Sequence, residues 1–160
     1  MENDNEDDIY LNLYNEFEKR IREKFGQNVH IYKEKPRQKD NILTPAFIIE
    51  MSDIDPTSSM GTGELEVSTR WSVLILISAS DFQSRVKIRS ASTKLASLFS
   101  EKILVNRTYP VVYLGSRDEN FMYDNNVEAW TSDFEIKTVV GNDMWDKWVY
   151  TNENIEITQE

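Results

Sequence analysis

The longest regular pattern in the chain is GELEVSTRWSVLILISA, from Gly63 to Ala79, where residues alternate as on a β-strand. One side is a continuous core face: Leu65, Val67, Thr69, Trp71, Val73, Ile75, Ile77 and Ala79. The other side begins polar and becomes apolar at Leu74 and Leu76. We therefore expect an inner half, from about Trp71, that is covered on both faces, and an outer half with a polar back.

This strand is too long for the globule that contains it. A straight strand of this length spans roughly 50 Å, whereas a compact chain of 160 residues has a diameter of roughly 40 Å. Two hypotheses follow. Either a bulge bends the strand back within the domain, or its outer half projects as a hairpin arm that lies across a neighbouring subunit. In the second case residues 46–54 form the other leg and PTSSMGTG (56–63) forms the tip.

Two stretches carry apolar residues at helical spacing. The first runs from about Glu6 to Phe25 and stops at Gly26. The second begins at the capping-box sequence Ser80-Asp81-Phe82-Gln83 and runs to about Lys102. Its expected buried side is Phe82, Val86, Ala91, Leu95, Leu98 and Phe99.

Further strands are expected at residues 29–35, 46–54, 108–116 and 127–141. The order of elements predicts an α+β fold: a mostly antiparallel sheet of four to five strands, two helices packed on one face, and a projecting long hairpin. We expect a disordered acidic N-terminus (1–5), a single domain (6–141) and a C-terminal tail (142–160).

The composition limits the function. A net charge of −10 argues against nucleic acid as a direct ligand, and the absence of cysteine removes disulfides, thiolate metal sites and cysteine nucleophiles. The chain opens with MENDNEDD, which is unlike a signal peptide, and has no apolar run of membrane-spanning length. We expect cytoplasmic synthesis and no contact with a membrane.

Few residues suggest chemistry. His30, the single histidine, lies in an alternating strand without a nucleophile beside it, which favours a structural role. Asp53 and Asp55 precede Pro56, where aspartates commonly cap turns. We expect no catalytic residue, metal or cofactor.

One enzymatic alternative stays open. Glu135-Ile136-Lys137, with Asp118, Asp124 and Glu128 upstream, matches the acid-x-lysine pair of metal-dependent nucleases. Carboxylates of such a pair hold the metal and the lysine stabilises developing charge. A solvated strand face is the simpler interpretation, because Glu135 lies opposite Trp130 and Phe134.

The order of TPAFIIE, GELEVSTRWSVLILIS, RSASTKLASLF and VEAWTSDFEIKT resembles small tail proteins of tailed bacteriophages. It is most similar to lambda-type tail terminator and tail completion proteins and to Mu-like prophage tail proteins, over about residues 6–141. The resemblance implies a non-enzymatic protein that forms a hexameric ring on the tail tube, contacts the head–tail connector, and passes from the host bacterial cytoplasm into the virion. A head-completion or baseplate adaptor is the non-enzymatic alternative.

With this resemblance, we expect residues 46–54 and 63–70 to form intersubunit arms and the basic side of the second helix to form a secondary contact. The aromatic tail MWDKWVY either folds back on the core or docks another protein. The candidate interface residues are Phe47, Ile49, Leu65, Val67, Arg70, Arg85, Arg89, Trp145 and Trp148.

Overall fold

The computed structural model describes residues 8–37, 41–59, 64–78, 82–119 and 126–140. These residues form two helices and five strands. In chain order the elements are α1 (Ile9–Phe25), β1 (His30–Tyr32), β2 (Ala46–Ser59), β3 (Leu65–Ser78), α2 (Phe82–Phe99), β4 (Val112–Asp118) and β5 (Val127–Val140). The expected disordered N-terminus and C-terminal tail lie outside the described residues.

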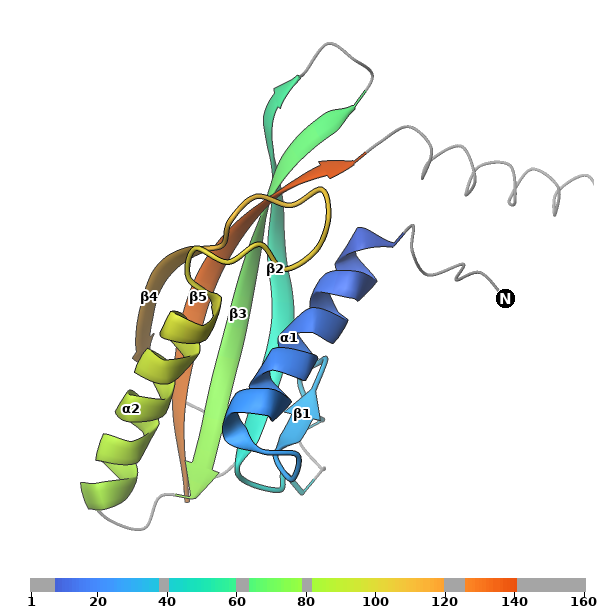
Figure 1. Ribbon diagram of the computed structural model, residues 1–160. Helices are drawn as coiled ribbons and strands as arrows, with labels where there is room; N and C mark the ends of the chain where they lie inside the picture. The colour runs from blue at the N-terminus through green and yellow to red at the C-terminus, as the bar shows by residue number, and fades with distance from the viewer. Residues whose placement is uncertain (1–7, 38–40, 60–63, 79–81, 120–125, 141–160) are drawn as a thin grey trace, which may run out of the picture.

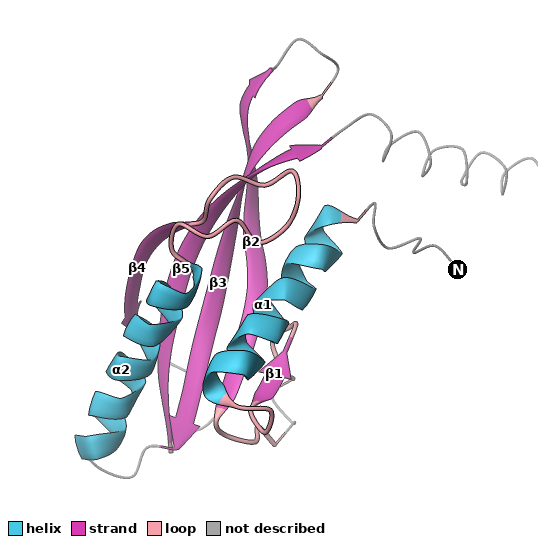
Figure 2. Ribbon diagram, in the orientation of Figure 1, coloured by secondary structure: helices cyan, strands magenta, loops and turns pink. Residues whose placement is uncertain are grey.

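The strands form one sheet in the order β1-β2-β3-β5-β4. β1 is parallel to β2, and the other neighbouring pairs are antiparallel. Both helices lie on the same face of this sheet (Figures 1 and 2). The α+β fold with a mostly antiparallel sheet and two helices on one face is therefore confirmed.

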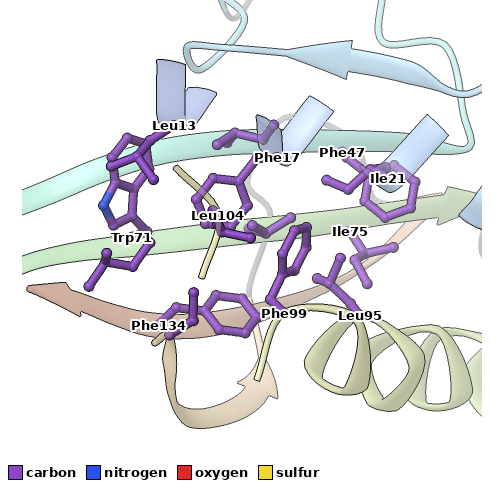
Figure 3. Packing of buried hydrophobic residues seen from close by; sticks show 14 of the residues in the cluster. Leu13, Phe17, Ile21, Phe47, Trp71, Ile75, Leu95, Phe99, Leu104 and Phe134 are labelled. Atoms are coloured by element: carbon purple, nitrogen blue, oxygen red, sulfur yellow. The ribbon is translucent and has the colours of Figure 1, made fainter. Parts of the chain in front are cut away.

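The main core lies between the helices and the sheet. Leu13, Phe17 and Ile21 of α1 and Leu95 and Phe99 of α2 point toward the strands (Figure 3). Ile88 of α2 belongs to the same buried cluster. The Phe17 ring is central, because its centroid lies 4.6 Å from that of Phe99 and 5.3 Å from that of Trp71. Burying an aromatic or aliphatic side chain of this size contributes about 1.5–3 kcal/mol, so this cluster fixes both helices on the sheet.

The buried side of α2 differs from the expected one. It consists of Ser84, Ile88, Ser92, Leu95, Ala96 and Phe99, while Phe82 and Val86 are 74% and 44% exposed. Serine and alanine are small, so they let this helix approach the strands closely. The prediction that Phe82 and Val86 are buried was wrong.

A second, smaller apolar cluster lies on the face of the sheet away from the helices. It joins Ala46, Ile48, Leu74, Leu76 and Ala129, and Tyr32 and Ile42 pack against it. Ile42 belongs to the connection between β1 and β2. The expectation that the inner half of the long strand is covered on both faces is therefore confirmed.

β2 is longer than predicted and contains an irregularity. It continues through Pro56 to Ser59, so Asp53 and Asp55 lie on a strand and the prediction of turn-capping aspartates was wrong. Register shifts lie between Met51 and Asp53 and between Pro56 and Ser59. Proline is tolerated here because β1 pairs only with residues 46–48, which leaves the rest of β2 at the edge of the sheet.

Candidate functional site: a projecting three-stranded arm

The hairpin of β2 and β3 extends beyond the helices (Figure 1). We use the word arm for residues 53–59 of β2, 65–70 of β3 and 135–140 of β5, which pair with one another. The hypothesis that a bulge bends the long strand back within the domain was wrong, because β3 pairs with β5 without a register shift and the extra residues lie in β2. The hairpin projects, as the second hypothesis expected, and its contact with a neighbouring subunit stays a prediction.

Side-chain faces in the arm follow from its register. Ile54 pairs with Thr69 and Pro56 with Val67, so these residues share the face on which the helices pack. Before the register shift, Met51 pairs with Trp71 on that same face. The shift therefore moves the helix-side positions of β2 from odd to even numbers, and Asp53 and Asp55 take the opposite face.

The helix-side face of the arm keeps exposed apolar surface. Ile54 is 50% exposed and Leu65 is 46% exposed, and Pro56 is exposed between them. We call these three residues the exposed apolar face of the arm. Apolar residues gathered on a projecting element are typical of a protein contact.

Buried hydrogen bonds anchor the base of the arm. The Trp71 indole Nε1 donates to Thr69 Oγ1 over 2.9 Å, and Thr69 Oγ1 donates to the Ile136 carbonyl over 2.8 Å. Both side chains are fully buried. The chain of two bonds links the arm segments of β3 and β5 directly to the aromatic core, so the arm leaves the sheet as a continuation of it.

The loop before β4 braces the β5 side of the arm. Tyr109 N donates to the Lys137 carbonyl over 2.9 Å, and Val139 N donates to the Arg107 carbonyl over 3.0 Å. The Tyr109 hydroxyl donates to Glu66 Oε2 over 3.2 Å. This bond and the charge of Glu66 raise the pKa of Tyr109, because phenolate formation would remove the donor and add a second negative charge.

The structure divides the predicted arm residues into two groups. Phe47, Ile49 and Val67 are buried within this chain, at 2%, 0% and 4% exposure. Leu65 and Arg70 are exposed. Only Leu65 and Arg70 of this set are on the surface, and Ile54 and Pro56 complete the exposed apolar face.

The predicted basic contacts on α2 already have partners in this chain. Arg85 Nε lies 3.5 Å from Glu128 Oε1, and the Arg89 guanidinium lies 5.7 Å from the centre of the Trp130 ring. Both bind α2 to β5 while staying exposed. Trp145 and Trp148 lie outside the described residues.

Glu135 and Lys137 share one face of β5, but Glu128 of the nuclease alternative does not join them. Glu135 shares the face away from the helices with Asp133, whereas Glu128 pairs with Arg85 of α2. Asp133 accepts from Ser72 Oγ over 2.7 Å and pairs with Arg117, and Asp124 lies outside the described residues. Within the part of the chain that the structure describes, no three His, Cys, Asp or Glu residues gather to hold a metal ion.

Comparisons with known proteins give little. No protein-family model matches the chain, and no curated protein matches it. A chain of the solved structure "Virion of native gene transfer agent (GTA) particle" is similar at a TM-score of 0.48 and 10% identity, covering 68% of this chain and 78% of that chain. Neither described helix has the length and apolar character needed to cross a bilayer.

Proposed function

We propose that the chain is a structural component of a phage or prophage-derived virion, a tail terminator or completion protein. In this proposal copies assemble through the arm into a hexameric ring at the end of the tail tube, where the ring meets the head–tail connector. The observation that carries the proposal is the exposed apolar face of the arm, Ile54, Pro56 and Leu65, on an element that projects beyond the helices.

A projecting arm can join copies into a ring. The arm lies at one end of the molecule, beyond the helices (Figure 1). The contact is heterologous when each arm reaches a different surface of the next copy and that copy's arm reaches on to a third copy. Two arms that reach each other's copies form a twofold dimer instead. Repeated heterologous contacts close into a ring when the rotation between copies divides the circle evenly.

Paired substitutions test the arm. The Ile54→Ser/Leu65→Ser variant removes both exposed apolar side chains and leaves the buried Val67 unchanged. The matched control is Leu43→Ser/Ile103→Ser, which removes two apolar side chains that are 57% and 60% exposed outside the arm. Circular dichroism checks that all three proteins fold.

We expect the unchanged chain to form closed rings in sedimentation and electron microscopy, the control to form the same rings, and the arm variant to form no rings. Binding of the rings to the ends of purified tail tubes then tests the terminator role. An unchanged chain that stays monomeric at about 100 μM and leaves tube ends free, or an arm variant that assembles normally, would overturn the proposal.

A further inference from the structure

A basic groove runs between the two helices, away from the arm. Its volume is about 680 Å³, and the charged side chains along it are Arg20 and Lys24 of α1, Lys94 of α2 and Lys102 just after α2. The hydroxyl-bearing residues Ser90, Thr93 and Ser97 also line the groove. The groove therefore gathers four of the chain's 18 lysines and arginines in a protein with a net charge of −10.

Most of this positive charge is not neutralised within the chain. Arg20 pairs with Glu16 at 2.8 Å. Lys24, Lys94 and Lys102 are exposed and make no ion pair with any described residue. Three unpaired ammonium groups around one groove attract carboxylates and repel other cations, so they favour an acidic occupant.

The chain itself contains an acidic segment of suitable size. Residues 2–7, ENDNED, carry four carboxylates and no basic side chain. We propose that the groove between α1 and α2 binds residues 2–7 of a second copy of this chain. The ammonium groups of Lys24, Lys94 and Lys102 then meet carboxylates of the neighbour, and the serine hydroxyls donate to its backbone or side-chain oxygens.

Chain geometry favours a second copy over the segment of the same copy. Asp8 caps the start of α1, and Lys24 lies about 22 Å along the helix from Ile9 at about 1.5 Å per residue. Glu6 and Asp7 reach only about 7 Å from Asp8, at about 3.5 Å per residue. A copy's own Glu6 and Asp7 therefore cannot reach Lys24, and its Glu2, at most about 21 Å from Asp8, comes near Lys24 only when the segment is fully extended along α1. A neighbour's segment can place all four carboxylates along the groove.

Complementation between two variants tests this contact directly. The neutral-segment variant carries Glu2→Gln, Asp4→Asn, Glu6→Gln and Asp7→Asn; the groove variant carries Lys24→Gln, Lys94→Gln and Lys102→Gln. Both also carry Ile54→Ser and Leu65→Ser, so that failure of this contact is separable from failure of the arm. A matched control for the groove variant is Lys19→Gln/Lys87→Gln/Lys137→Gln, which removes three exposed lysines outside the groove.

We expect neither variant to associate alone and their equimolar mixture to form a complex in sedimentation. The association should be at least about tenfold tighter than for either variant alone, given three exposed ion pairs. It should weaken between 0.05 and 0.3 M NaCl, because salt screens exposed charges. The control variant keeps an intact groove, so it should associate as tightly as a chain with all its lysines.

A peptide gives a second measurement. An acetylated, fluorescent peptide of residues 1–8 should bind the neutral-segment variant, and a peptide with the acids replaced by their amides should not. Binding of the acidic peptide without complex formation in the mixture would place the segment in its own groove and overturn the proposal. The proposal would also be overturned if the acidic peptide bound the groove variant as tightly as the neutral-segment variant. The same holds if the Lys19/Lys87/Lys137 control lost as much peptide binding as the groove variant.

Discussion

At the scale of single residues, Thr69 connects the arm to the core. Its hydroxyl accepts from the Trp71 indole and donates to the Ile136 carbonyl, and it is fully buried. Trp71 in turn packs against Phe17 and, edge to face, against Tyr14 at 4.8 Å. One hydroxyl therefore satisfies a buried donor in the aromatic core and links β3 to β5.

Replacing Thr69 by valine keeps the shape and leaves the Trp71 N–H buried without an acceptor. We expect the free energy of unfolding in urea to fall by about 1–3 kcal/mol, the cost of an unsatisfied buried polar group. Thr93→Val is the control, because Thr93 is exposed and its hydroxyl donates to the Arg89 carbonyl in the same helix. That variant should stay within about 0.5 kcal/mol of the unchanged chain; equal losses for both variants would contradict the role of Thr69.

Residue burial was predictable where the pattern has a single period. The alternation in β3 placed Trp71, Val73 and Ile75 correctly in the core, since side chains of a strand can take only two faces. The face of α2 was harder to predict. The buried side of α2 includes Ser84 and Ser92. A pattern of apolar residues predicts that serines face solvent, so Phe82 and Val86 were wrongly predicted to be buried.

At the scale of elements, the register shift in β2 decides which side chains the arm offers. The length of β3 predicted either a bend in this strand or a projecting arm, because a strand of that length exceeds the diameter of the globule. The exposed apolar face of the arm could not be predicted, because a shift around Ser52 leaves no mark in the hydrophobic pattern. Without that shift, Asp53 and Asp55 rather than Ile54 and Pro56 would be assigned to the helix side.

Deleting Ser52 should change the direction of the arm without changing how β2 pairs with β3. After the deletion Met51 still pairs with Trp71 and Asp53 still pairs with Arg70. The pairing of β2 with β3 on either side of the deletion is therefore unchanged, and each side chain stays on its face of the sheet. The extra residue of a bulge bends a strand and increases its twist, so its loss should redirect the arm. We expect the free energy of unfolding to change by less than about 1 kcal/mol, while ring formation, measured by sedimentation, is lost.

Two outcomes would contradict this account of Ser52. Normal rings from the deletion variant would mean that the bend does not set the position of the neighbour. A loss of more than about 3 kcal/mol on deletion would mean that the irregularity supports the packing of the core itself. Deletion of Gly61, between β2 and β3, serves as a control for shortening the chain by one residue.

At the scale of the whole molecule, the two proposed contacts differ in their electrostatics. Each copy carries a net charge of −10, so copies brought together repel one another at long range. The exposed apolar face of the arm gains free energy from the removal of apolar surface from water, which salt does not screen. The basic groove gains it from exposed ion pairs, which salt does screen.

Salt should therefore act in opposite directions on the two contacts. Raising NaCl from 0.1 to 1 M shortens the screening length from about 10 Å to about 3 Å, which reduces repulsion between copies and leaves apolar burial intact. For the neutral-segment variant with an intact arm, we expect the fraction in rings at a fixed protein concentration to rise several-fold, as measured by sedimentation. The Ile54→Ser/Leu65→Ser variant should show no such rise. Rings that dissolve as salt increases would instead identify ion pairs as the force that holds the arm to its neighbour.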